Sequence, residues 1–141
     1  MRYYLDTNIL VFLKLNEKDE INRDVGLILF DYENTLTTSS VCVAELLHLI
    51  QIGKLGKRNP NTNCLGDEVM LWLDEMGITI VPTTAVHLRR YADLPLHEDH
   101  RDPSDRLIIA QAIVDRIPLI SSDRKFDRYI REGLQFVFNE R

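Results

Sequence analysis

Two short apolar segments, one near each end of the chain, lead into aspartates. Residues 3–5 precede Asp6, and residues 118–120 are followed by two serines and Asp123. Short buried strands that alternate with helices pair in parallel, and the groups just past their C-terminal ends line one crevice. We therefore expect the two aspartates to meet at one edge of a parallel sheet. Carboxylates gathered in a crevice either repel one another or hold a divalent cation.

The apolar pattern alternates between strand-like and helix-like segments along the chain. Strands are predicted at residues 2–5, 35–38, 78–81, 118–121 and 135–138. Helices are predicted at residues 8–16, 19–32, 40–53, 67–76, 84–93, 103–116 and 124–131. The polar, turn-rich stretch from Gly53 to Gly66 predicts an exposed loop. Alternation of this kind indicates an α/β fold with a parallel sheet, and we expect one domain over residues 1–141.

Composition excludes several classes of protein. Two cysteines are too few for a disulfide framework, and without a CxxC pair a zinc ribbon is excluded as well. Asp6 interrupts the only apolar stretch near the N-terminus, which spoils the core of a signal peptide. No apolar run reaches the roughly 18 residues that a membrane span needs. The expectation is a soluble, cytoplasmic protein with no membrane partner.

Charge is unevenly distributed. The net charge of −5 argues against a protein that coats nucleic acid unspecifically. Residues 124–131, however, carry four cations against one acid immediately after Asp123. An acidic pocket beside a basic rim suits a phosphate backbone held near metal ions, whereas the alternative is an ordinary solvated helix face. Arg106, Arg124 and Lys125 are the candidates for holding flanking phosphates.

Glu45 lies in the predicted helix at residues 40–53. Its neighbours one turn away are Val41 and Leu49, and the helix is apolar nearly all round, so we expect the side chain to be buried. A lone buried carboxylate destabilises the fold by several kcal/mol unless it is paired, protonated or metal-bound. A salt bridge to an arginine is the alternative to a metal.

The segment from Asp102 to Ala112 permits two interpretations. Asp102 fits the N-cap of a helix, Pro103 its first position, and Asp105 its third, where a carboxylate interacts well with the helix N-terminus. These local roles explain both aspartates without any chemistry. The functional interpretation keeps Asp102 as the cap and directs Asp105 into the crevice. Local structural roles could likewise explain the other two aspartates: Asp6 could form an Asx turn, and Asp123 could be the N-cap of the short helix that follows it.

Four segments together resemble PIN-domain nucleases, and most closely the VapC-type toxin ribonucleases of prokaryotic toxin–antitoxin pairs. The matching segments, in the family's order, are Leu5 to Asn8, Ser39 to Leu46, His100 to Ala112 and Ile120 to Asp123. The resemblance implies a three-layer α/β/α domain with a central parallel sheet of about five strands. The family usually has an aromatic residue in place of Ser104 and a threonine in place of Ser121.

The resemblance also implies the site and the partners. Asp6, Glu45, Asp105 and Asp123 would form an acidic quartet. Thr7 or Asn8, Asp102 and Ser122 would support it. The implied activity is cleavage of single-stranded or looped RNA, and the implied partners are an antitoxin that covers the crevice and a second copy of the chain in a homodimer.

Hard oxygen ligands without thiolate or imidazole select Mg²⁺ or Mn²⁺ rather than zinc. One ion, or two about 3.5–4 Å apart, would orient and deprotonate a water for attack on a phosphodiester. We expect Asp6 and Asp105 to be the main ligands and Glu45 to bind directly or through water. Asp123 would be the most peripheral.

Two other functions remain open. A phosphohydrolase with an aspartyl nucleophile at Asp6 also begins with a strand-end aspartate, but Asn8 stands where its second aspartate is needed. A catalytically inactive RNA- or protein-binding domain on the same fold is the non-enzymatic alternative. His97 and His100 form an HxxH pair, for which a surface or hydrogen-bonding role is more typical than zinc. The resemblance gives His100 a role in ordering its loop or touching substrate.

Overall fold

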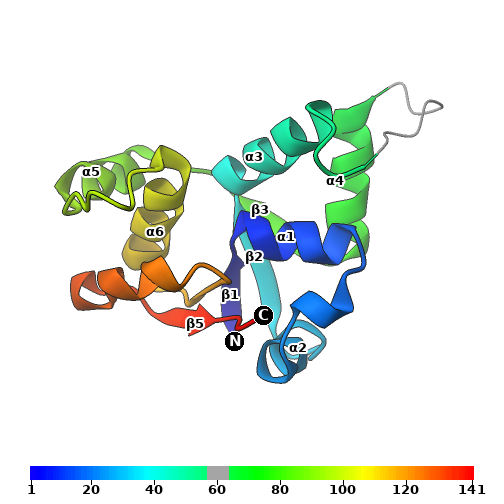
Figure 1. Ribbon diagram of the computed structural model, residues 1–141, viewed down its shortest axis with the longest axis horizontal. Helices are drawn as coiled ribbons and strands as arrows, with labels where there is room; N and C mark the ends of the chain where they lie inside the picture. The colour runs from blue at the N-terminus through cyan, green and yellow to red at the C-terminus, as the bar shows by residue number, and fades with distance from the viewer. Residues whose placement is uncertain (57–63) are drawn as a thin grey trace.

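A computed structural model of the protein, describing residues 1–56 and 64–141, contains one five-stranded parallel sheet (Figure 1). The strands are β1 (Arg2–Leu5), β2 (Thr35–Ser39), β3 (Ile78–Val81), β4 (Leu119–Ser121) and β5 (Phe136–Phe138). They lie in the order β3-β2-β1-β4-β5, and every neighbouring pair is parallel. The predicted α/β class with a five-stranded parallel sheet is confirmed.

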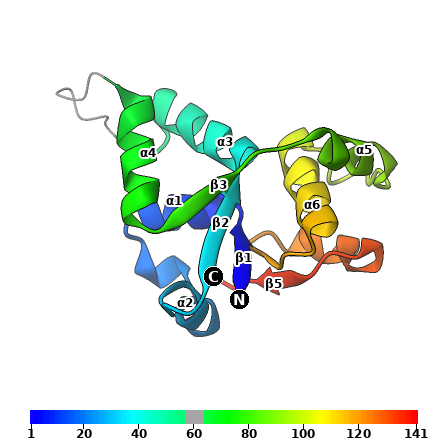
Figure 2. The same ribbon diagram turned by 180° about the vertical axis from the view of Figure 1, so that it is seen from behind.

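Helices cover both faces of the sheet and complete a three-layer arrangement. The helical segments are α1 (Thr7–Lys14), η1 (Lys18–Glu20), α2 (Arg23–Leu29), α3 (Ser40–Gln51), α4 (Leu65–Glu75), α5 (Ala85–Asp93), α6 (Pro103–Asp115) and η2 (Arg124–Glu132). In both views α1, α2 and α4 lie on one side of β1 and β2, whereas α5 and α6 lie on the other (Figures 1 and 2). The predicted loop at 53–66 is shorter than expected because α4 begins at Leu65, and its residues 57–63 lie outside the described residues.

One predicted helix is wrong. The sequence predicts a continuous helix over residues 19–32, but the structure has the short 3₁₀ turn η1 and then α2. Asn22 separates them: its backbone is extended, and its side chain accepts a hydrogen bond of 2.8 Å from the Val25 amide, so it caps the start of α2. Asparagine favours caps over helix interiors because its side chain competes for backbone groups.

Strand register brings the ends of β1, β2 and β4 to the same edge of the sheet. Leu5, the last residue of β1, pairs with Thr38 of β2 on one side and with Ile120 of β4 on the other. Asp6 therefore follows β1 at the level where β2 leads into α3 and β4 leads toward Asp123. This register is what gathers acidic residues from distant parts of the sequence.

A buried polar network ties α6 to the sheet beneath this edge. Gln111, which is fully buried, accepts a hydrogen bond of 2.8 Å from the Ser39 hydroxyl and donates to the Tyr4 hydroxyl and to the Val81 carbonyl. Buried amides are stable only when their donors and acceptors are satisfied, as here. The network fixes α6 against β1, β2 and the end of β3.

None of the helices within the described ranges combines the length and the apolar character that crossing a membrane requires.

Candidate active site

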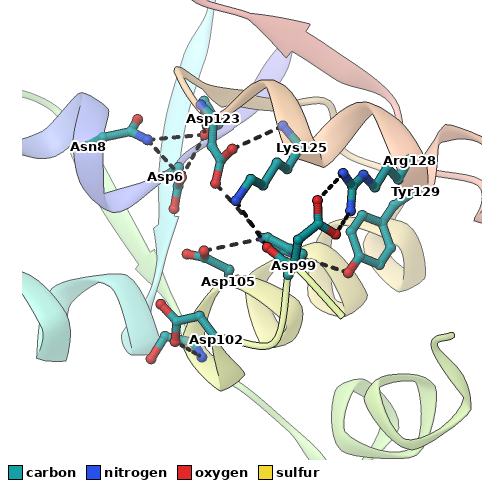
Figure 3. Close-up of polar contacts among 12 residues, drawn as sticks. Asp6, Asn8, Asp99, Asp102, Asp105, Asp123, Lys125, Arg128 and Tyr129 are labelled. Carbon is teal, nitrogen blue, oxygen red and sulfur yellow. Dashed lines mark hydrogen bonds and ion pairs between the residues drawn. The ribbon is translucent and has the colours of Figure 1, made fainter. Parts of the chain in front are cut away.

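Carboxylates from four elements surround one pocket of about 300 Å³. Its lining residues are Asp6, Thr7, Asn8, Val11, Phe12, Glu45, Leu49, Asp105, Asp123 and Arg141. Figure 3 shows Asp6, Asp105 and Asp123 converging from the start of α1, from α6 and from the start of η2. The structure thus brings together all four members of the predicted acidic quartet, and their chemical roles remain predictions.

Asp6 is only 3% exposed and is held in one orientation. It caps α1, and its Oδ1 accepts a hydrogen bond of 2.8 Å from the Thr7 amide. Its Oδ2 accepts one of 2.7 Å from the Ser121 hydroxyl. Burial raises the pKa of Asp6 to about 6, although these two hydrogen bonds favour the charged form. Where the sequence offers an Asx turn as the local alternative, Asp6 is the N-cap of the helix that Thr7 begins, and this local role coexists with a position in the pocket.

Asn8 connects Asp6 to the C-terminal end of β4 through hydrogen bonds. Its Nδ2 donates to Asp6 Oδ2 and to the Ser121 hydroxyl, each at 3.2 Å, and its Oδ1 accepts from the Ser122 amide at 3.2 Å. The Ser122 hydroxyl instead accepts a hydrogen bond from Asn139. Ser122 thus contacts Asn8 through its backbone, the hydroxyl that contacts Asp6 belongs to Ser121, and a supporting role for Ser122 stays a prediction.

Glu45 is half-buried rather than buried as the sequence predicts. The reason is that α3 leaves this side facing the pocket, so the apolar residues around Glu45 do not enclose it. No arginine or lysine forms an ion pair with Glu45 among residues 1–56 and 64–141, so the salt-bridge alternative finds no support there. One of its carboxylate oxygens lies within 4.8 Å of oxygens of Asp102 and Asp105.

The N-terminus of α6 has the predicted cap. Asp102 accepts a hydrogen bond of 3.1 Å from the Ser104 amide, and Pro103 occupies the first turn. Asp105, 22% exposed, turns into the pocket. Burial raises the pKa of Asp105 to about 8, and the negative charges of Asp6, Asp102, Glu45 and Asp123 raise it further. Without a cation, this carboxyl group holds a proton at neutral pH.

Asp123 is the most exposed of the three aspartates that line the pocket, with 32% of its side chain accessible. It caps η2 by accepting a hydrogen bond of 3.0 Å from the Lys125 amide, as the capping alternative predicts. Its second oxygen lies 3.9 Å from Nε2 of His100. The same nitrogen lies 3.4 Å from Asp105 Oδ2.

His100 is a site residue that the sequence does not single out as a metal ligand. It is 4% exposed, and burial lowers its pKa. An HxxH pair within a loop is only weak evidence for a metal ligand. What places His100 at the pocket is its contact with η2, and the sequence does not reveal that contact. The resemblance in the segment from His100 to Ala112 marks the position without defining its contacts.

The predicted phosphate contacts need one correction. Arg106 is 6% exposed, and its guanidinium donates a hydrogen bond of 3.0 Å to the Leu94 carbonyl and lies over the Tyr91 ring. It points into the protein and is not available to a phosphate. Arg124 is exposed and stacks on Phe138, and Lys125 is exposed with its Nζ 3.0 Å from the Asp99 carbonyl. Their contact with phosphate stays a prediction.

Arg141 is a second residue that sequence reasoning misses. It lines the pocket, its guanidinium lies 5.0 Å from the centre of the Phe12 ring, and its Nε donates to Glu20. Nothing in the local sequence indicates this position, since it depends on the path of the chain after β5. The pocket therefore has a cation at its rim, held by an ion pair with Glu20 although its side chain is 57% exposed.

A larger cavity of about 530 Å³ lies near α2 and α4. Its lining is mostly apolar, and the acidic side chains there, Asp31, Asp74 and Glu75, are exposed. In the smaller pocket, by contrast, Asp6 and Asp105 are largely buried and both have raised pKa values. Convergent ionisable groups with shifted pKa values indicate a functional site better than cavity volume does. We therefore take the smaller pocket as the candidate active site.

The donor set of the pocket fits a divalent cation. Carboxylate oxygens from Asp6, Glu45, Asp105 and Asp123 share a partly desolvated space. Burial first, and repulsion between these carboxylates second, raises the pKa of Asp6 and Asp105. The buried Nε2 of His100 faces the same space with no hydrogen-bond partner within the described part of the chain. A cation would satisfy both the charges and this nitrogen.

Solved structures with the same fold are VapBC assemblies and a toxin–antitoxin complex. VapBC2 from Rickettsia felis, bound to a DNA fragment from its promoter, has a TM-score of 0.69 and 21% identity, covering 99% of this chain and 100% of that one. VapBC-1 from nontypeable Haemophilus influenzae has a TM-score of 0.64 and 22% identity, covering 98% of each chain. A toxin–antitoxin complex from Klebsiella pneumoniae has a TM-score of 0.62 and 18% identity, covering 96% and 95%.

At these identities the structural likeness shows the fold. A comparison with curated protein sequences gives no match. The family model described as PIN domain matches residues 3–132, which is nearly the whole chain and includes all four carboxylates of the pocket. The chain therefore belongs to the PIN domain family.

Proposed function

We propose that this protein is a divalent-metal-dependent endoribonuclease and the toxin of a type II toxin–antitoxin pair. The observation that carries the nuclease proposal is the convergence of four carboxylates on one pocket, two of them with raised pKa values. The likeness to VapBC assemblies and to a toxin–antitoxin complex supports the biological setting.

Each carboxylate has a distinct role in this proposal. Asp6 and Asp105 would hold Mg²⁺ or Mn²⁺, because they are the carboxylates whose charge is least tolerated without a cation. When bound, one or two ions would supply an activated water and neutralise charge on the phosphate. Glu45, half-buried and unpaired by any basic side chain of the described residues, is the candidate to accept the proton of that water.

RNA is the proposed substrate. The pocket is a concave site of about 300 Å³, so a strand must bend to bring a phosphodiester to the carboxylates. Unpaired or looped RNA bends at little energetic expense, whereas a duplex does not. Arg124 and Lys125, exposed at the start of η2 next to Asp123, would hold phosphates on one side.

The direct test is cleavage of total RNA in the presence of Mg²⁺ or Mn²⁺, with mapping of the fragment ends. We expect endonucleolytic fragments with either ion, none in EDTA, and none from Asp6→Asn purified in parallel. The substitution keeps the size of the side chain and removes its charge, so circular dichroism should show the same fold. Equal cleavage by Asp6→Asn and the unaltered protein would refute the proposal.

Arg141 is proposed to hold a phosphate at the rim of the pocket. Phe12 and Glu20 fix its guanidinium at the rim, which limits the entropy lost on binding. Arg141→Gln is expected to raise KM for a short single-stranded RNA by about 3- to 10-fold and to leave kcat within about twofold, because one phosphate contact is lost. Steady-state kinetics at two salt concentrations measures this.

Arg23→Gln is the matched control for that change, since Arg23 is exposed at the start of α2 and does not line the pocket. It removes the same charge and should leave both constants unchanged. An equal KM increase in the two variants would show that net charge, rather than a contact of Arg141, is responsible.

The two alternative functions, a phosphohydrolase and a catalytically inactive binding domain, predict different experimental results. An aspartyl phosphohydrolase would form a covalent acyl-phosphate on Asp6, detectable by mass spectrometry after an acid quench. Asn8 has a structural role, since it forms hydrogen bonds with Asp6, Ser121 and Ser122. Its amide cannot serve as the second acid that the phosphohydrolase mechanism needs. A catalytically inactive domain would bind RNA without producing fragments.

The antitoxin partner, the homodimer and a cytoplasmic location are expectations that accompany this proposal. An antitoxin that covers the pocket should abolish RNA cleavage when mixed in equimolar amount. It should also protect Asp105 and Asp123 from carbodiimide labelling, since both are partly exposed.

A further inference from the structure

His100 has one ring nitrogen that is anchored and one that is not. It lies in the connection between α5 and α6 and is 4% exposed. Nδ1 is 2.8 Å from the Tyr129 hydroxyl, and the ring packs edge-on against Phe126 and Tyr129. These contacts with η2 fix the direction of Nε2.

Nε2 points at the carboxylates of the pocket rim. It lies 3.4 Å from Asp105 Oδ2 and 3.9 Å from Asp123 Oδ2, and it has no hydrogen-bond partner in the parts of the chain that the structure describes. A buried polar nitrogen without a partner is destabilising and calls for an explanation. Either a proton on this nitrogen or a cation between it and the two carboxylates would satisfy it, and only the cation also offsets the repulsion between the carboxylates.

The connection that carries His100 is itself held in place. Arg128 forms an ion pair with Asp99, the neighbouring residue, and Lys125 Nζ donates to the Asp99 carbonyl (Figure 3). The His100 amide donates to the His97 carbonyl at 3.1 Å. Arg128 and Lys125 of η2 therefore hold the connection beside the pocket, and this fixes the position of His100.

The two known separations from Nε2 are close to those between ligands of a metal ion, and all three donor atoms lie within 4.8 Å of one another. Ligands bound at about 2.1 Å lie about 3.0 Å apart at right angles and about 3.4 Å apart at tetrahedral angles. The two distances from Nε2, 3.4 and 3.9 Å, need only small side-chain rotations to reach these values. Asp105 belongs both to this group and to the group formed with Glu45 and Asp102.

We propose that His100 Nε2, Asp105 and Asp123 form a mixed nitrogen–oxygen cation position at the edge of the pocket. It takes a first-row transition ion such as Mn²⁺ in preference to Mg²⁺. The inference rests on the proposed metal-dependent function, because Asp105 is shared, and it changes the ion preference expected from oxygen ligands alone. Imidazole favours transition ions, whereas Mg²⁺ favours oxygen ligands and retains water. Tyr129, bonded to Nδ1, would orient the ring as metal-bound histidines require.

The test compares metal binding in the unaltered protein, His100→Gln and the matched control His97→Gln. His97 is in the same connection and packs on the same Tyr129 ring, but it is not in the donor group. Titration calorimetry gives Kd for Mn²⁺ and for Mg²⁺, and pulsed electron paramagnetic resonance of bound Mn²⁺ detects coupling to an imidazole nitrogen. The protein is used without RNA, so activity does not enter the readout.

We expect nitrogen coupling in the unaltered protein and in His97→Gln, and its loss in His100→Gln. The preference for Mn²⁺ over Mg²⁺ should fall about tenfold in His100→Gln only. If His100→Gln fails to fold, Asp123→Asn serves instead: it removes an oxygen donor of the same group, so it should weaken Mn²⁺ binding while the nitrogen coupling persists in the ion that is bound.

Absence of nitrogen coupling in the unaltered protein would overturn the assignment, and His100 would then be only a hydrogen-bond partner of Asp105. That result would leave the proposed function intact if Mn²⁺ still binds and RNA is still cleaved. Failure of Mn²⁺ and Mg²⁺ to bind at all would overturn both proposals together.

Discussion

Asp105→Asn is expected to reduce metal-dependent RNA cleavage by about three orders of magnitude or more, because it removes the carboxylate shared by both candidate donor groups. The charges of four other acids act on Asp105, which makes it the centre of the cluster. Asparagine has nearly the same size, so the loss would reflect charge and metal binding rather than packing. Single-turnover cleavage of an RNA with a mapped cleavage site measures the effect.

Asp127→Asn is the control for the loss of one acidic charge. Asp127 lies in η2, four residues after Asp123. Its side chain is exposed and does not line the pocket. Its cleavage rate should stay within about twofold of the unaltered protein. If Asp105→Asn retained a tenth of the activity or more, Asp105 would not be a main metal ligand.

The fold could be predicted because its determinants are local. Apolar runs of strand length that alternate with helices identify a parallel sheet, and register then places Asp6 and Asp123 at one edge. The capping roles of Asp102 and Asp123 follow from residue type and spacing, and both are confirmed. The division of the predicted helix at 19–32 was missed because Asn22 also fits a helix interior when only apolar spacing is considered.

The parts of the site that could not be predicted depend on contacts between distant segments. Glu45 looks enclosed on a helical projection, but whether it is enclosed depends on what packs against that side of α3. Arg106 looks like a rim cation until the position of Leu94 is known. His100 and Arg141 enter the site through Tyr129 and Phe12, which lie 29 and more than 100 positions away in the sequence.

The acidic pocket has a consequence for stability that separates it from an ordinary surface cluster. Asp105 has a pKa raised to about 8 and Asp6 a pKa raised to about 6, both above the value of 3.8 for an unperturbed aspartate. The folded, metal-free protein therefore binds more protons than the unfolded chain between about pH 4 and pH 8. Stability falls with rising pH wherever the folded state binds more protons. A pocket built for a cation should weaken the protein when the cation is absent.

Other groups titrate in ways that can be separated from this effect. The Arg128 guanidinium lowers the pKa of Asp99 below its usual range, so Asp99 titrates under more acidic conditions. Burial lowers the pKa of His100, which makes stability rise with pH near neutrality and opposes the effect of the aspartates. A comparison with Asp105→Asn at each pH cancels the contributions that do not involve Asp105. The neutral amide resembles the protonated acid at every pH.

Asp105→Asn is accordingly expected to be more stable than the unaltered protein in EDTA, and by more at pH 8.5 than at pH 5. The gain should grow by about 2 kcal/mol over this range, a value kept below the full pKa shift because Asp105 is 22% exposed. Urea unfolding at the two pH values measures it. In saturating Mn²⁺ the order should reverse, since the ion binds the ionised carboxylates and stabilises only the protein that retains them. Equal stability of the two proteins at both pH values would mean that Asp105 is an ordinary solvated carboxylate and that the pocket does not require a cation.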